Sequence, residues 1–300
     1  MYVVTGATGK TGSVVARALL AKDEKVRVVG QNLEQMRCLV EAGAEPVVCD
    51  VTDADGLCRA FTNAQAVFAM IPPHFTSPDY RAYQECVVGS FARALASSGV
   101  KYAVSLSSIG ADKCEKTGPV VGLHKFEERL NQISALNVVH LRAGYFMENT
   151  LAQIAVIKMA GVCGGPLLPE LKLPMIAMRD IGEYAAKRLL LLDFTDRQTQ
   201  ELLGHRDLSM TEASAAIGRA IGEPDLPYVQ IPDAQVRPAL MHAGMSQNAA
   251  DLILELSDAL NSGHVRALEE RNAVNTTPTS YEAFVTEEFL PAFHGRRTAA

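Results

Sequence analysis

Three glycines near the start of the chain have the spacing of a phosphate-binding turn. Gly6, Gly9 and Gly12 stand in "VTGATGKTGS", between a short apolar run and an alanine-rich one. Glycine weakens helices and strands because it loses the most backbone entropy on folding, so three at a junction indicate that another group approaches the backbone closely. Gly6 would allow a sharp turn after a strand, Gly9 the approach of a diphosphate, and Gly12 close packing of a helix.

The helix that follows this turn would supply the groups that bind the phosphates. Backbone amides near its start have no partner within the helix, and the helix dipole favours negative charge there. We therefore predict that a dinucleotide binds along the turn; a tight turn that binds no ligand is the alternative. The predicted diphosphate-binding residues are Gly6, Thr8, Gly9, Lys10, Thr11 and Gly12.

The elements that must position this turn alternate between strand and helix patterns up to residue 142. Strands are expected at 2–5, 26–29 and 45–49 and in "AQAVFAMIPP", "VKYAVSLSS" and "NVVHLRAG"; helices are expected at 10–21 and 33–41, after Asp53, along the stripe Tyr83, Val87, Phe91 and Leu95, and at 121–136. Strands separated by helices pair in parallel, and continuously apolar strands are covered on both faces. This predicts an α/β fold with a doubly wound parallel Rossmann sheet, whose ligands bind beyond the carboxyl ends of the strands.

After residue 150 the alternation stops. Residues 161–180 are rich in glycine and proline, so we expect a loop with at most one short strand there. Helices are expected after Asp180, after Thr211 and after Ser246, each as the capping residue, and in "TPTSYEAFVTEEFLPAF". We predict a Rossmann domain at 1–150 and a smaller, mostly helical substrate-binding or lid region at 151–300, with residues 180–208 packing back on the first domain.

The composition excludes several classes of protein. The chain has 300 residues, 48% of them hydrophobic and 21% charged, as in a folded globular protein, and its net charge of −6 argues against a nucleic-acid partner. The nearest basic pair, Arg296 and Arg297, stands in a tail expected to be solvated. The six cysteines are scattered, so we expect reduced thiols in the cytoplasm and no metal site. Neither a signal peptide nor a membrane span is expected.

Four segments together resemble a known family. "TGATGKTG", "LHKFEERL", "LRAGYFMENT" and "TPTSYEAFV" are similar to the NmrA-like branch of the atypical short-chain dehydrogenases/reductases, and the resemblance covers nearly the whole chain. The glycine spacing is GxxGxxG rather than the usual GxGxxG. The resemblance implies an NAD(P)H-dependent reductase of a quinone-like, carbonyl or imine small molecule. The alternative that it implies is a non-catalytic sensor that reads the redox state of NAD(P) and binds a regulatory protein partner.

The end of the second strand favours NADP over NAD as the cofactor. NAD enzymes usually have a carboxylate there, and "VRVVGQN" has none to repel a 2′-phosphate. Many relatives have arginine where Gln31 stands, so the usual phosphate clamp is absent too. Gln31 and Asn32 would hydrogen-bond a hydroxyl or a phosphate, with Lys10 or Arg37 supplying positive charge. A solvated turn at Gln31 is the alternative.

Two further strand ends are predicted to contact the adenosine. Asp50 resembles the acidic residue of the family that accepts a bond from the adenine amino group, although a turn or helix cap would explain it too. Met70, Ile71 and Pro72 end the fourth strand, where relatives pack against adenosine, and a plain core strand end is the alternative.

The sequence indicates the residues for proton transfer less clearly than those for cofactor binding. Ordinary members of the superfamily use a serine with a Tyr-x-x-x-Lys pair; here Ser107 and Ser108 stand at the expected place, but "GPVVGLHKFEERL" lacks the pair. His124 and Lys125 are the nearest substitutes: His124 would relay a proton and Lys125 would hold the nicotinamide ribose. Otherwise His124 is partly buried and Lys125 solvated. Glu127 is expected on the helix surface.

The segment after the sixth strand is predicted to form the substrate pocket. In "GYFMEN", Tyr145 and Phe146 would wall the pocket, while Asn149 would bind a substrate oxygen or cap the next helix. A small-molecule substrate is therefore expected, and a homodimer or a regulatory protein remains the candidate partner.

Overall fold

The strand order of the main sheet determines where its ligand crevice lies. In a computed structural model, which describes residues 1–295, seven parallel strands follow the order β10-β6-β5-β4-β1-β2-β3. Their bounds are β1 Tyr2–Thr5, β2 Val26–Gly30, β3 Glu45–Val48, β4 Ala66–Ala69, β5 Tyr102–Ser108, β6 Asn137–Ala143 and β10 Arg197–Leu202. From β1 the chain builds outward to β3, then returns to add β4 on the other side of β1. The crevice at this switch point lies beyond the carboxyl ends of β1 and β4.

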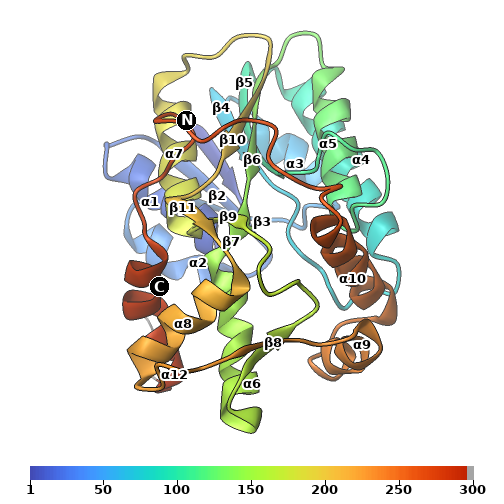
Figure 1. Cartoon of the computed structure of the whole chain (residues 1–300). Coiled ribbons are helices and arrows are strands. Elements are labelled where there is room, and N and C mark those ends of the chain that lie inside the picture. The colour runs from blue at the N-terminus through green and yellow to red at the C-terminus, as the bar shows by residue number, and fades with distance from the viewer. Residues whose placement is uncertain (296–300) are drawn as a thin grey trace.

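Helices cover both faces of this sheet (Figure 1). One face carries α1 Lys10–Leu20, α2 Leu33–Glu41 and α7 Met178–Leu191; the other carries α3 Ala54–Phe61, α4 Tyr80–Ser98 and α5 Val120–Asn131. Successive strand residues point to opposite faces, so Val4 joins the core beneath α1 and Val3 the core beneath α4. Burial on both sides explains the continuously apolar strands, and the predicted doubly wound sheet is confirmed.

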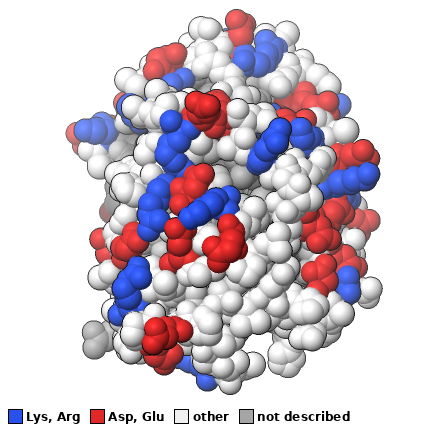
Figure 2. Space-filling model, in the orientation of Figure 1, with Lys and Arg blue, Asp and Glu red and all other residues white. Residues whose placement is uncertain are grey.

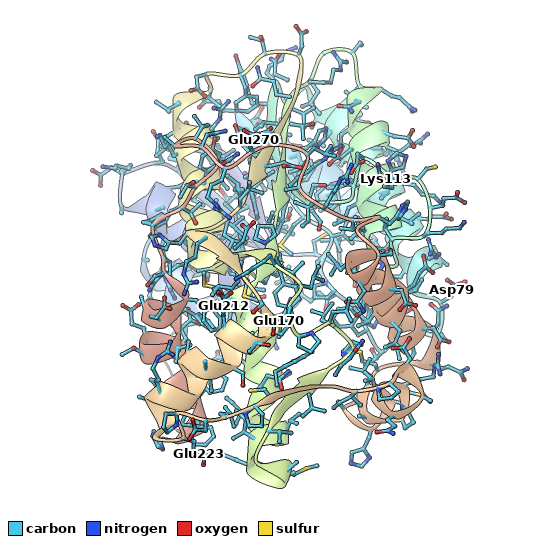
Figure 3. The ribbon with its side chains drawn as sticks, in the orientation of Figure 1. Asp79, Lys113, Glu170, Glu212, Glu223 and Glu270 are labelled. Atoms are coloured by element: carbon cyan, nitrogen blue, oxygen red, sulfur yellow. The ribbon has the colours of Figure 1, made fainter. Side chains whose placement is uncertain are left out.

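Short polar side chains fix the starts of the helices. Asp53 accepts the amides of Asp55 and Gly56, which confirms the predicted cap of α3. Asp79 caps α4 by accepting the Ala82 amide at 2.9 Å (Figure 3). Such caps satisfy amides that have no partner within the helix.

A second unit packs around its own core, beside the carboxyl edge of the main sheet (Figure 1). It contains two small sheets: β7 Tyr145–Phe146, β9 Leu173–Ile176 and β11 Arg206–Leu208 in one, β8 Cys163–Gly165 and β12 Tyr228–Gln230 in the other. Its helices are η1 Met147–Ala152, α6 Gln153–Ala160, α8 Met210–Ile221, α9 Asp233–His242, α10 Gln247–Asn261, α11 Tyr281–Phe284, η2 Val285–Phe289 and α12 Leu290–Phe293. The chain enters this unit twice. The intervening residues 178–202 form α7, which packs on the main sheet, and β10, which belongs to it.

Several local predictions were wrong. The expected loop at 161–180 contains two strands, β8 and β9, which are too short and too rich in glycine and proline to show a strand pattern. Asp180 is not a cap: α7 begins at Met178, and the buried Asp180 carboxylate accepts the Thr279 amide and hydroxyl.

The start of α8 and the end of α5 also differ from the prediction. Ser209, not Thr211, caps α8, because Ser209 and Glu212 form a reciprocal capping box. Thr211 instead donates its hydroxyl to Glu170, which lies close to Glu212 in Figure 3. The fifth helix ends at Asn131, five residues before the predicted end at Leu136.

On the face drawn in Figure 2, acidic and basic side chains are interspersed. Within residues 1–295, no helix has both the length and the apolar character that crossing a bilayer requires. The predicted solvated pair Arg296 and Arg297 lies outside the described residues.

Candidate functional site

The glycine turn occupies the switch point of the sheet. Gly6 directly follows β1 with φ of +62°, a conformation that side chains other than glycine rarely adopt. A Cβ atom at Gly12 would overlap the Gly6 carbonyl oxygen, so Gly12 lets the helix close on the turn. Gly9 is exposed, and a Cβ atom there would meet only that same oxygen, at 3.3 Å. Gly6 and Gly12 shape the turn, and Gly9 keeps its outer side open.

The first turn of α1 can accept a diphosphate. Gly9 stands at its N-cap, and no side chain within residues 1–295 makes a capping hydrogen bond there. The first amides of a helix have no partner within it, and its dipole favours an anion at this end. Thr8 is exposed beside these amides, whereas Thr11 is buried. The chain therefore presents free donors and room for the phosphates.

The predicted adenosine contacts come together at the ends of β2 and β3. Gln31 Nε2 donates to Asp50 Oδ2 at 2.6 Å, and Asp50 Oδ1 accepts the Thr52 amide at 2.8 Å. The Asn32 side chain caps α2. Gln31, Asn32 and Asp50 thus have intramolecular partners, and their contacts with a dinucleotide stay predictions. Arg37 pairs with carboxylates of its own helix.

The end of β4 contacts the glycine turn. Met70 lies over Gly6, with its sulfur 2.5 Å from where a Gly6 Cβ atom would stand. Ile71 is buried in the core beneath α4, and the Pro72 carbonyl accepts the Tyr83 hydroxyl at 3.0 Å. Two segments that are about sixty residues apart in the sequence therefore meet at the switch point.

The three candidates for proton transfer do not hydrogen-bond one another within residues 1–295. Ser107 donates to Glu127 Oε1 at 2.5 Å. His124 donates from Nδ1 to the Ala111 carbonyl at 2.8 Å, beside the loop that follows β5. Lys125 forms an ion pair with Glu85 of α4, on the outer surface. The structure therefore places Lys125 in a surface ion pair, and its contact with the nicotinamide ribose stays a prediction.

Glu127 is buried, which corrects its predicted place on the helix surface. Only 5% of the residue is exposed, and its carboxylate binds Arg142 of β6 through two bonds of 3.0 and 2.6 Å. Ser107 and Arg142 are neighbours across β5 and β6, so one carboxylate joins both strands to α5. The signal was Arg142 itself, because a charged residue inside an apolar strand needs a buried partner.

The predicted substrate residues bridge the two units of the protein. Tyr145 packs against the core of the second unit, and Phe146 packs against the core beneath α1. Tyr145 is half-buried, and the nearby Asn149 is exposed. Burial raises the pKa of Tyr145 to about 12, so this phenol is a neutral hydrogen-bonding group near pH 7.

Glu148, between these residues, was missed. It is 8% exposed, and its Oε1 accepts the Met178 amide at the start of α7 at 2.9 Å. Burial raises the pKa of Glu148 to about 7. Close by, Lys10 of the glycine turn forms an ion pair of 3.0 Å with Glu288 of η2. Only the position of Glu148, straight after the apolar "YFM", could have indicated its burial.

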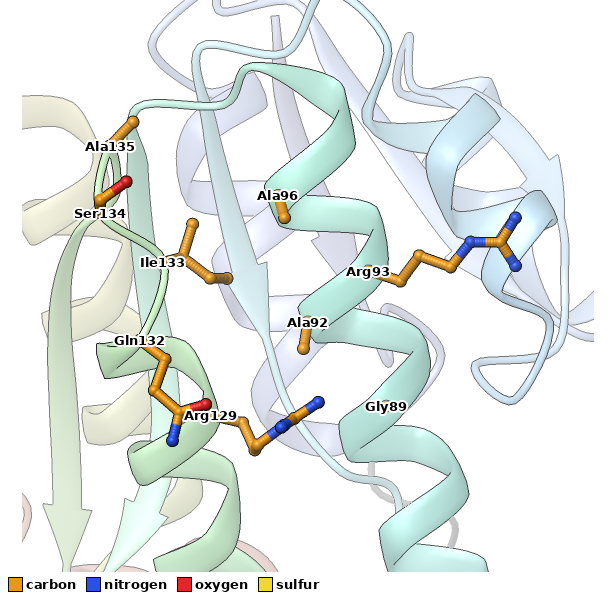
Figure 4. Close-up of a pocket in the computed structure, with 9 residues that line it drawn as sticks. All are labelled: Gly89, Ala92, Arg93, Ala96, Arg129, Gln132, Ile133, Ser134 and Ala135. Carbon is orange, nitrogen blue, oxygen red and sulfur yellow. The ribbon is translucent and has the colours of Figure 1, made fainter.

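Two hollows lie away from these residues. One, of about 450 Å³, runs between α4 and α5 (Figure 4). The other, of about 560 Å³, lies against the end of α10 and the loop at Lys116. Neither is lined by a predicted site residue. Among the described residues, no group of three histidines, cysteines or carboxylates could hold a metal ion.

Comparison with known proteins places this geometry in a family. The model of the NmrA-like family matches residues 2–290, whereas no curated protein matches. An NADPH-dependent quinone oxidoreductase from Escherichia coli, solved with NADPH, is 20% identical with a TM-score of 0.75, over 100% of this chain and 96% of that one. A triphenylmethane reductase from Citrobacter sp., solved with NADP(H), is 16% identical with a TM-score of 0.79, over 96% and 100%. NmrA, a negative transcriptional regulator solved with NADP, is 15% identical with a TM-score of 0.67, over 98% and 97%.

Proposed function

The chain belongs to the NmrA-like family, and we propose that it is an NADPH-dependent reductase of a quinone-like, carbonyl or imine small molecule. The observation that carries the proposal is the uncapped glycine turn at the switch point of the sheet. Its donors suit a diphosphate, and the exposed Gly9 leaves the approach open.

NADP is the proposed cofactor. The three similar structures described above were all solved with NADP or NADPH. The end of β2 has Gln31 where an NAD enzyme usually has a carboxylate. Gln31 is held by Asp50, so its amide would have to turn from that carboxylate to bind a ribose hydroxyl or phosphate. All six cysteines are unpaired thiols, which supports a reducing compartment such as the cytoplasm.

The proposed hydride transfer does not require a strongly acidic side chain as proton donor. NADPH, when bound, would supply a hydride to the acceptor. The segment from Tyr145 to Asn149 would orient that acceptor by its apolar wall and by the Asn149 amide. Ser107 donates to the buried Glu127, whereas His124 binds the Ala111 carbonyl through Nδ1 only and has its Nε2 3.4 Å from Glu128 Oε2. Positioning the two reactants against each other would supply most of the rate enhancement.

A second candidate is a sensor of the NADP redox state that regulates a protein partner. Two observations favour it: Lys125 pairs with Glu85 on the outer surface, and the Tyr-x-x-x-Lys pair is absent. A sensor must bind oxidised and reduced cofactor with different affinities, because only differential affinity shifts an equilibrium.

Calorimetry with NAD, NADH, NADP and NADPH, followed by turnover assays on a panel of quinones, carbonyls and imines, tests both candidates. The reductase requires tight NADPH binding and oxidation of NADPH by at least one acceptor. Preference for an oxidised form with no turnover on any acceptor would leave the sensor. Failure of all four dinucleotides to bind at millimolar concentration would exclude both.

A further inference from the structure

One buried carboxylate beside the glycine turn is only half satisfied by the fold. Glu148 Oε1 accepts the Met178 amide at 2.9 Å, but Oε2 has no hydrogen-bond partner among residues 1–295. The residue is more than nine-tenths buried and lies in η1, near Lys10 and Met178, the first residues of α1 and α7. Burial disfavours the charged carboxylate, so this group binds a proton more readily than an exposed one.

The charges around Glu148 are arranged so that one cation opposes protonation. The charged groups on the elements packed around it are Lys10 of α1, Arg179 and Asp180 of α7, and Glu287 and Glu288 of η2. Arg179 is engaged by Glu287, and Asp180 by Thr279. The positive charge of Lys10 lowers the pKa of Glu148, whereas burial, the largest cause, and Glu288 raise it.

A dinucleotide would change this balance in one direction. Lys10 stands in the turn that would hold the diphosphate, and its ammonium now binds Glu288 at 3.0 Å. A diphosphate brings negative charge to the N-terminus of α1 and competes with Glu288 for the Lys10 ammonium. More negative charge nearby and a better neutralised Lys10 both favour protonated Glu148.

We propose that dinucleotide binding at the glycine turn takes up one proton from solvent and that Glu148 receives it. The inference rests on the proposed function, because it needs a dinucleotide in that turn. Glu148 acts on the cofactor through Lys10, so it is a positioning residue. Because binding and proton uptake are linked, the dissociation constant rises with pH, by up to about tenfold per pH unit where uptake is complete.

Calorimetric titration of the whole protein with NADPH at pH 8, in two buffers of different ionisation enthalpy, counts the protons. At this pH the 2′-phosphate is already ionised and does not contribute. We expect uptake of about half a proton or more, and a dissociation constant that rises about 3- to 10-fold from pH 7 to pH 8. Glu148→Gln should abolish both effects. Glu287→Gln is the matched control, since its carboxylate pairs with Arg179 rather than Lys10, and should keep them.

An infrared difference spectrum on adding NADPH to the unmodified protein gives a second readout, and the Glu148→Gln spectrum assigns it. The carbonyl band of a protonated carboxyl group should appear for the unmodified protein and not for Glu148→Gln. Binding without proton uptake, or without this band, overturns the inference and leaves the proposed function intact. Uptake that persists in Glu148→Gln also overturns it. Absence of NADPH binding overturns both.

Discussion

Gly12 is the residue at which the glycine turn tolerates least change. Replacement by alanine would drive a methyl group into the Gly6 carbonyl oxygen, which is backbone and cannot swing aside. We expect Gly12→Ala to lower the free energy of unfolding by about 1–3 kcal/mol and to weaken NADPH binding at least tenfold, because the first turn of α1 must shift. Urea denaturation and calorimetry measure the two effects.

Gly89 provides the matched control for this substitution. It is exposed in the middle of α4, with nothing within 4 Å of an added Cβ atom. Alanine there should raise the free energy of unfolding by about 0.5–1 kcal/mol and leave binding unchanged. Equal effects of Gly12→Ala and Gly89→Ala would refute the close contact in the turn.

His140 makes stability depend on pH. Burial lowers the pKa of its imidazole to about 4, with Arg142 adding to this and Glu127 opposing it. Nε2 donates to Asn131 Oδ1 at 3.0 Å, and Nδ1 accepts the Ser105 hydroxyl at 2.6 Å, so the neutral ring is fully hydrogen-bonded. The unfolded chain binds a proton near pH 6.5 and the folded one does not, so the free energy of unfolding should fall by about 3 kcal/mol between pH 6.5 and 4.

Urea denaturation from pH 8 to pH 4 checks this expectation. In His140→Gln the fall below pH 6.5 should shrink, whatever the variant costs at pH 8. His242→Gln is the control, because His242 is exposed at the end of α9. The same slope in both variants would mean that other groups cause the fall.

Some local helix caps could be predicted from the sequence, whereas the distant partners of buried charges could not. Asp53 and Ser246 cap helices that begin within three residues of them, so the signal and its partner stand together. Glu127 is buried because it binds Arg142 of β6. Glu201 is buried because it accepts the amide of Leu268, 67 residues away. Such pairs become visible only when the strands are placed.

At the scale of elements, the segment 262–280 behaves as a strap across the carboxyl edge of the sheet. It joins α10 to α11 without helix or strand, and Figure 3 labels its residue Glu270 in the upper part of the view. The buried Glu201 of β10 accepts the amides of Leu268 at 3.0 Å and Glu269 at 2.9 Å. Arg271 donates to the Leu203 carbonyl at 3.0 Å, so both contacts tie the strap to β10 and the residue that follows it.

Removing the Glu201 carboxylate should release the strap. Glu201→Ala leaves two amides without an acceptor, which should cost about 2–3 kcal/mol locally. We expect hydrogen exchange in residues 266–272 to accelerate about 30- to 100-fold, with the amides of β1 and β4 unchanged. Glu201→Gln keeps one carbonyl acceptor and should give a smaller acceleration. Equal exchange in all three proteins would show that Glu201 does not hold the strap.

Strands β1 to β6 of the main sheet were predictable because strands and helices alternate there, whereas β10 was not, because it lies beyond residue 150, where that alternation stops. The small strands β8 and β9 of the second unit were not predictable either, because they are three and four residues long and contain two glycines and one proline between them. The start of α7 was misplaced for another reason. Its amide at Met178 is capped by Glu148, 30 residues earlier, so no capping residue stands next to the helix.

At the scale of the whole molecule, the chain passes back and forth between the two units. The chain leaves the main sheet at β7, returns as α7 and β10, and leaves again at β11. Asp180 of α7 accepts the Thr279 amide at 3.0 Å, and Lys10 of α1 pairs with Glu288 of η2 at 3.0 Å. Because neither core is built from one continuous segment, we expect both to unfold in one cooperative transition.

NADPH should therefore stabilise both units equally, although it would contact mainly the unit that contains the main sheet. At a free concentration of one hundred times its dissociation constant, a ligand adds about 2.7 kcal/mol to the free energy of unfolding. The slowest-exchanging amides of β5 and of α11, one from each unit, should gain the same protection, roughly a hundredfold. Gly12→Ala at the same NADPH concentration should gain less, since it binds weakly. A gain in β5 without one in α11 would mean that the second unit opens independently, as a separate lid, while the sheet stays folded.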